Sequence, residues 1–172
     1  MSFLDIDNLP DKTRVFIDAN IFIYHFAGVS NQCTNLLYKV MNRTVDAIVS
    51  TIVIAEVIHR RMIAEAIDNG LATTKNVIKK LKNYPDLIKN LTQYSKDIDN
   101  ILSLPIIVGS ITKTDIINST SLRAKYGLLT NDSLNLAFME RHKITHIVTH
   151  DSDFDAISGI TVLKPADIHI VI

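Results

Sequence analysis

The 172-residue sequence contains one cysteine, Cys33, and no tryptophan. A single thiol cannot close a disulfide within the chain, and no combination of cysteine and histidine has the spacing of a zinc site. Lys+Arg and Asp+Glu both number 18, so the formal net charge is +0. A neutral chain has no overall attraction for nucleic acid, and any such contact must come from a local surface.

Long apolar runs are also missing. The most apolar stretch, residues 47–58, contains Glu56 and is shorter than the roughly 20 residues that cross a bilayer. The first ten residues lack the basic-then-apolar order of a signal peptide. We therefore expect a cytoplasmic protein with no membrane association.

What the sequence does contain is typical of a globular domain. Hydrophobic residues make up 47% and charged residues 21%, and the length suits one domain with a sizeable core. There is no repeat, low-complexity segment or linker, so we expect a single domain over residues 1–172.

Strand and helix signals alternate along the chain. Residues 1–12 are expected to form a short leader, and Pro85 to separate two amphipathic helices within residues 72–104. We expect strands at residues 14–17, 46–50, 106–111, 146–149 and 161–163. Further helices are expected at residues 19–26, 31–41, 51–67, 112–124 and from 131 or 132 onward. This order predicts a three-layer α/β/α fold with a central, mainly parallel sheet, which binds ligands at the carboxyl ends of its strands.

Four acidic residues lie at the ends of apolar runs or inside them: Asp18, Glu56, Asp132 and Asp151. A carboxylate against apolar surface must be neutralised, hydrogen-bonded or paired with a cation. If the fold gathers several carboxylates at one point, a hard divalent cation relieves their repulsion. The pattern therefore favours metal-assisted phosphodiester chemistry.

Each acid also has a structural explanation. Asp18 and Asp132 are placed to cap the helices that follow them, and Asp151, Asp153 and Asp155 fit a solvated turn. Glu56 has Arg60 one helical turn later, but such a pair contributes only about 0.2–0.5 kcal/mol. Because that gain does not justify a carboxylate among apolar neighbours, we favour a site role for Glu56.

The basic and histidine side chains are less informative. Only His59 and His150 lie near candidate acids, and metal-binding histidines usually come with other nitrogen or sulfur ligands. Most Lys and Arg side chains fit solvated helix surface, but a subset could flank an acidic cleft and hold a phosphate backbone. That basic set is Arg60, Arg61, Lys75, Lys79, Lys80, Lys82, Arg123, Lys125, Arg141 and Lys143.

Four segments in order resemble the PIN-domain family, small metal-dependent ribonucleases that include the VapC toxins of toxin–antitoxin pairs. They are VFIDANIFIY, STIVIAEVI, LLTNDSLNLAFM and HIVTHDSDFDAISGITVLKP, and together they span residues 14–165. The resemblance implies that Asp18, Glu56, Asp132 and Asp151 hold Mg²⁺ or Mn²⁺, with Asp153 as a fifth member. It also implies supporting roles for Asn20, Thr51 and Thr149.

The resemblance further implies an RNA substrate, an antitoxin partner and a homodimer. Apolar residues near the N-terminus, including Ile21, Phe22 and Tyr24, are expected to form part of the dimer interface. One departure from the family is the long gap between Glu56 and Asp132, which the helical residues 72–104 fill.

Two other classes of protein compete with the nuclease hypothesis. A phosphatase or receiver-type domain would need a second Asp beside Asp18, where the chain has Ala19 and Asn20. A catalytically idle PIN-like scaffold, or a protein that only binds RNA, would have no use for the acidic set.

Overall fold

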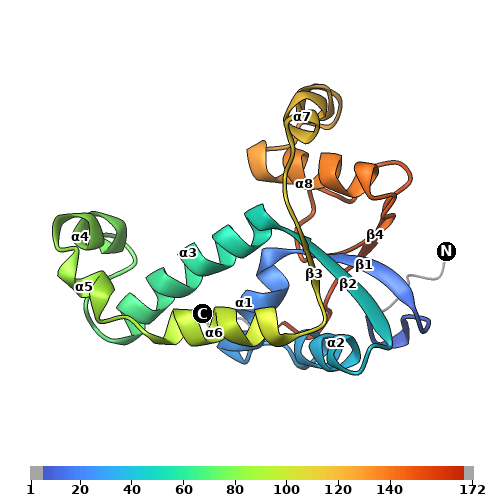
Figure 1. The fold of residues 1–172 in the computed structure, drawn as a ribbon. Helices are drawn as coiled ribbons and strands as arrows, with labels where there is room; N and C mark the ends of the chain where they lie inside the picture. The colour runs from blue at the N-terminus through green and yellow to red at the C-terminus, as the bar shows by residue number, and fades with distance from the viewer. Residues whose placement is uncertain (1–5, 169–172) are drawn as a thin grey trace.

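The computed structural model describes residues 6–168, which build a five-stranded sheet with helices on both faces (Figure 1). The strands are β1 (Thr13–Ile17), β2 (Val45–Ser50), β3 (Ile107–Gly109), β4 (His146–Val148) and β5 (Thr161–Leu163). Their order is β3-β2-β1-β4-β5, and every neighbouring pair is parallel. The expected α/β/α architecture is confirmed. The third strand is shorter than the expected 106–111.

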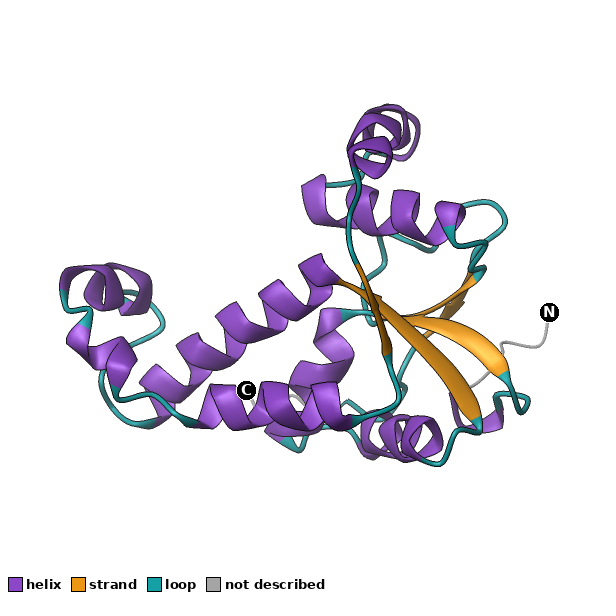
Figure 2. Cartoon of the chain, in the orientation of Figure 1, coloured by secondary structure: helices purple, strands orange, loops and turns teal. Residues whose placement is uncertain are grey.

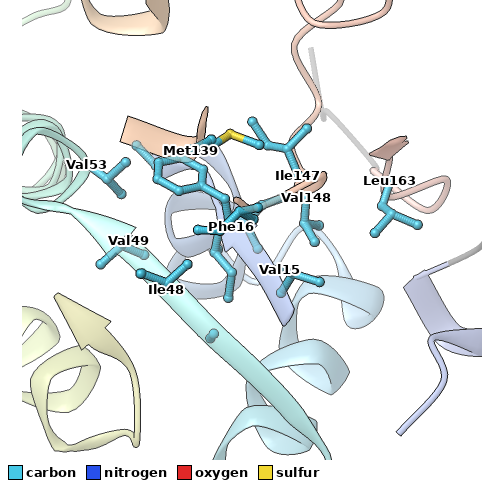
Figure 3. Packing of buried hydrophobic residues seen from close by; sticks show 14 of the residues in the cluster. Val15, Phe16, Ile48, Val49, Val53, Met139, Ile147, Val148 and Leu163 are labelled. Atoms are coloured by element: carbon cyan, nitrogen blue, oxygen red, sulfur yellow. The ribbon is translucent and has the colours of Figure 1, made fainter. Parts of the chain in front are cut away.

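The central strand β1 is apolar on both faces, as a strand covered by two helical layers must be. Val15, Phe16 and Ile17 are fully buried. Figure 3 shows Phe16 beside Met139 from the helical layer and close to Ile48 and Val49 from β2. This core holds the carboxyl end of β1, where Asp18 follows, in a fixed position.

The helices of the two outer layers follow the strands in sequence. They are α1 (Ala19–Ala27), α2 (Asn31–Met41), α3 (Thr51–Asp68), α7 (Lys113–Tyr126) and α8 (Thr130–Arg141). Figure 2 shows α7 and α8 on one side of the sheet and α2 on the other. No helix within the described part of the chain is both long and apolar enough to span a membrane.

Residues 72–104 form three helices where we expected two: α4 (Val77–Asn83), α5 (Asp86–Lys89) and α6 (Gln93–Ser103). Pro85 precedes the one-turn helix α5, a position where its missing N–H costs nothing. These helices enclose a second apolar cluster against the end of α3, centred on Ala66, Val77, Leu81 and Leu91. The extra segment is therefore a packed extension of the domain.

Two internal contacts fix the strand β3 and the helices after it. Asp115 accepts hydrogen bonds from Arg141 Nε at 2.8 Å and Nη2 at 2.9 Å, and it also completes a capping box with Thr112. Gly109 lies against the Phe138 ring so closely that a Cβ at this position would be 2.6 Å from two ring carbons. The backbone of β3 therefore has no room for a side chain at this point.

Two expectations about the N-terminal region are changed by the structure. Ile21 and Phe22 are fully buried in the core of their own chain, so they do not form an apolar surface for a partner. This burial reflects the two-layer covering of β1, which needs the inner face of α1. The expected leader contains a short 3₁₀-helix, Ile6–Asn8, while residues 1–5 lie outside the described residues.

Candidate metal centre

Asp18 follows β1 directly and caps α1. Its Oδ1 accepts the backbone N–H of Ala19 at 2.7 Å, which satisfies a helix amide that has no partner within α1. Its Oδ2 accepts from Asn20 Nδ2 at 2.7 Å and from Thr149 Oγ1 at 2.6 Å. A carboxylate can accept about four hydrogen bonds, so these three contacts orient Asp18 and leave room for a cation.

Thr149 links the ends of β1 and β4. Its hydroxyl donates to Asp18 and accepts from Asn20 Nδ2 and from the backbone N–H of Asp151, both at 3.0 Å. The Asp151 carboxylate in turn accepts the N–H of Asp153 at 3.0 Å. The sequence motifs around Asp18 and Asp151 thus meet in one hydrogen-bonded network, as their positions at neighbouring strand ends predicted.

Glu56 lies in the second turn of α3 and is less buried than its apolar neighbours suggested. Its side chain is 33% exposed, and its Oε1 lies 3.6 Å from Nη1 of Arg60. The pair with Arg60 therefore exists, but at this distance and exposure it contributes little to stability. The expectation of a buried Glu56 carboxylate was wrong, because one side of α3 is exposed to solvent at this position.

Asp132 lies in the first turn of α8 and is the most perturbed of the candidate acids. Burial is the largest cause that raises its pKa from 3.8 to about 6, followed by the charges of Asp18, Asp151, Asp153 and Glu56. Burial also raises the pKa of Asp18, and the charges of Glu56 and Asp151 raise it further, although the hydrogen bonds from Thr149 and Ala19 oppose them. The charges of the four other candidate acids therefore all act on Asp132.

Hard carboxylate oxygens are the donor set that Mg²⁺ and Mn²⁺ prefer, and the four carboxylate charges that act on Asp132 would attract a cation. Within residues 6–168, however, no group of three or more His, Cys, Asp and Glu side chains has the spacing of a preformed metal site. The residues thus fit a divalent cation in chemistry and in location. Side-chain rotation would have to bring the carboxylates to ligand distance.

Several polar contacts around the acids were not expected from the sequence. The hydroxyl of Ser50, which is the N-cap of α3, donates to Asn135 Oδ1 at 2.6 Å, while Thr51 is exposed. His150 lies edge-on to Tyr24, with Nδ1 3.4 Å from the tyrosine hydroxyl. The sequence gives one signal for these contacts. Asn135 follows Asp132 by three residues and lies among apolar neighbours, which indicates a buried polar side chain.

A model of the PIN domain family matches residues 15–160, and the chain therefore belongs to the PIN-domain family. It is similar to Ribonuclease VapC2 of Methanocaldococcus jannaschii, with 28% identity over 90% of this chain and 95% of the relative. Ribonuclease VapC6 of the same organism is 26% identical over 88% of this chain and 97% of the relative.

Solved structures share the fold. VapBC2 from Rickettsia felis bound to a DNA fragment from its promoter matches 89% of this chain and 99% of its own, with a TM-score of 0.60 and 16% identity. A toxin–antitoxin complex from Klebsiella pneumoniae matches 90% of this chain and 99% of its own, with a TM-score of 0.58 and 21% identity.

Proposed function

We propose that residues 1–172 form one PIN domain that acts as a metal-dependent endoribonuclease, with Mg²⁺ or Mn²⁺ held by Asp18, Glu56, Asp132 and Asp151 and assisted by Asp153. The observation that carries the proposal is the meeting of these acids. Thr149 joins Asp18 to Asp151 by hydrogen bonds, and the charges of Asp18, Asp151, Asp153 and Glu56 add to burial in raising the pKa of Asp132. Such mutual repulsion is unfavourable in a protein that binds no cation.

Some residues would hold the cation, and others orient the residues that hold it. Asn20 and Thr149 keep the Oδ2 atom of Asp18 in one orientation, and the α1 N-terminus holds Oδ1. A bound cation would activate a water molecule and stabilise negative charge on the phosphate and on the leaving oxygen. No histidine or lysine is needed as general base in this scheme. Arg60, beside Glu56, is placed to contact a phosphate of the substrate.

The choice of RNA rests on the relatives, two of which are named ribonucleases. The test is cleavage of single-stranded RNA by purified protein in Mg²⁺ or Mn²⁺, with and without EDTA. We expect cleavage only with the metal, and a loss of at least about a hundredfold in Asp18→Asn, because removing one charged ligand weakens the whole site. Asp99→Asn, an exposed residue of α6, is the matched control and should keep full activity. Metal-independent cleavage by the Asp18 variant would refute the proposal.

An antitoxin partner is the second part of the proposal. It is supported by the likeness to a toxin–antitoxin complex and to VapBC2. A cytoplasmic location belongs to the same proposal, because a toxin would meet cellular RNA there. The test is whether the product of a small gene adjacent to this one binds the purified protein and inhibits its cleavage of RNA. Neither binding nor inhibition by that product would count against a toxin role.

We also propose a homodimer, with an interface different from the one expected near the N-terminus. Ile107 of the edge strand β3 is 59% exposed, and Ile116 and Ile117 of the following helix are 56% and 61% exposed. Exposed apolar side chains on the edge strand and on the helix that follows it favour burial against a second copy. Light scattering should give twice the 19.3 kDa monomer mass, and Ile107→Lys with Ile117→Lys should halve it. A wild-type monomer at micromolar concentration would refute this.

A catalytically idle scaffold, or a protein that only binds RNA, is the alternative. It is favoured by the absence of a preformed metal-binding group among residues 6–168. Calorimetric titration with Mn²⁺ separates the two, because an idle scaffold should show no saturable binding that depends on Asp18 and Asp132.

A further inference from the structure

Helix α4 and the residues just before it form the most positively charged short segment of this neutral chain. Residues 69–85 include Lys75, Lys79, Lys80 and Lys82 but no Asp or Glu. Lys75, Lys79 and Lys82 are exposed, and none of the ion pairs found in residues 6–168 involves them. Their charges are therefore available to an anionic partner.

These lysines line a surface hollow. A cavity of about 410 Å³ is bordered by Lys75, Lys79 and Lys82 together with the polar side chains of Thr74, Asn76 and Asn83. The hydroxyl and amide groups add neutral hydrogen-bond donors to the three ammonium groups. Tyr84, which ends the helix, is 60% exposed. Ammonium groups with amide donors bind phosphates, and an exposed aromatic ring offers a face for stacking a base.

The basic helix is held rigidly relative to the acidic residues. The Glu65 carboxylate accepts the backbone N–H groups of Thr92, Gln93 and Tyr94 at 2.7, 2.9 and 2.9 Å, which ties the start of α6 to α3. Arg61 donates to Asp97 at 2.7 Å, and both side chains are largely buried. The second apolar cluster then packs α4 against the end of α3. These contacts attach the extension to the far end of α3.

The two charged surfaces lie at opposite ends of α3. Glu56 is near its first residue, and the twelve residues from there to Asp68 span about 18 Å at 1.5 Å per residue. In Figure 1, α4 stands beyond the far end of α3, on the side where α8, with Asp132, stands near its start. A strand lying along α3 would reach both surfaces.

We propose that Lys75, Lys79 and Lys82 bind the phosphate backbone of the single-stranded RNA whose scissile bond lies at the carboxylates. This inference rests on the proposed function. It explains what the helical extension contributes, because the acidic centre repels RNA unless a cation is bound and a separate basic surface supplies affinity. Because the surface would contact only phosphates and the face of one base, its affinity should depend on the length of the RNA strand and not on its sequence.

The first test is binding of a fluorescent RNA of about 20 nucleotides in EDTA, where no cleavage occurs. The variant Lys75→Gln/Lys79→Gln/Lys82→Gln should raise the Kd about tenfold or more and reduce the slope of log K against log salt by about 2, at roughly 0.7 per lost phosphate contact. The control Lys96→Gln/Lys113→Gln/Lys143→Gln removes the same charge from exposed lysines outside α4. Circular dichroism confirms that both variants fold. An unchanged Kd in the α4 variant, or an equal loss in the control, overturns the inference.

The second test uses cleavage and depends on RNA length. With Mg²⁺, the α4 variant should raise the KM for the long RNA and leave kcat unchanged, and it should cleave a tetranucleotide as well as wild type does, because so short a strand does not reach α4. An equal effect on both RNAs would contradict the proposal. If the wild-type protein cleaves neither RNA, the proposed nuclease activity fails, and the binding test still decides whether α4 holds RNA.

Discussion

Replacing Asp132 with Asn should stabilise the protein when no divalent metal is present. The folded state raises the pKa of Asp132 from 3.8 to about 6 through burial and four neighbouring carboxylates. Each pKa unit corresponds to 1.36 kcal/mol, so the ionised side chain costs at most about 3 kcal/mol at neutral pH, and solvent screening lowers this cost because Asp132 is only partly buried. Asn removes this cost but loses the attraction of a carboxylate to the α8 N-terminus, about 0.3–1 kcal/mol. We expect a net gain of about 1–2 kcal/mol.

The pH dependence has a definite sign. Because the pKa is higher in the folded state, folding takes up a proton between pH 3.8 and about 6, and the wild-type protein loses stability as pH rises through that interval. The advantage of Asp132→Asn should therefore be full at pH 7.5 and absent near pH 4. Urea unfolding in EDTA at both pH values measures it, with Asp99→Asn as the exposed control.

Saturating Mg²⁺ or Mn²⁺ should make the wild-type protein more stable than Asp132→Asn. A cation bound only by the folded protein stabilises it in proportion to the logarithm of its concentration over Kd, and the variant lacks one of the ligands. A variant that is less stable than wild type at pH 7.5 in EDTA would show that Asp132 has a favourable structural role and is not held there against repulsion.

Three further substitutions test separate parts of the structure, and Asp86→Asn serves as an exposed control. Gly109→Ala should cost about 1–3 kcal/mol in urea unfolding, because the new Cβ would lie 2.6 Å from the Phe138 ring, and an unchanged midpoint would contradict the packing described. Asp115→Asn should cost about 1.5–3 kcal/mol, because the buried side chain loses its charge-assisted hydrogen bonds with Arg141. Burial alone would raise the pKa of Asp115, but its hydrogen bonds with Arg141 and Thr112 lower it, so this cost should disappear as pH falls below about 4. Asp86→Asn, in an exposed pair with Lys89, should change nothing. Glu56→Gln should cut RNA cleavage without loss of stability, whereas lower stability with full activity would mean that Glu56 only pairs with Arg60.

The parallel sheet and the meeting of Asp18 with Asp151 could be predicted from the sequence because both depend on local patterns. Apolar runs followed by an acid indicate buried strands. The alternation of strands and helices predicts a parallel sheet in which the carboxyl ends of these strands lie at the same edge. The N-cap role of Asp18 was likewise predictable, and it is compatible with the proposed metal role because Oδ1 and Oδ2 have different partners.

What could not be predicted depends on contacts between distant segments. Ser50 and Asn135 meet although 85 residues separate them, and neither shows a local signal for the other. Apolar composition alone did not tell whether Ile21 and Phe22 face the core or a partner, and both face the core. Pro85 was expected to separate two helices, but it starts a third, α5. The number of helices in this short amphipathic segment depends on how the segment packs against α3.

The most direct test of the central claim is a crystal structure of the protein grown with Mn²⁺, with the metal located by its anomalous scattering. The account predicts a peak bonded to Asp18 and to at least two of Glu56, Asp132 and Asp151, at about 2.1 Å from their oxygens. A crystal of RNA-cleaving protein with Mn²⁺ bound elsewhere, or with no peak at these carboxylates, would contradict it.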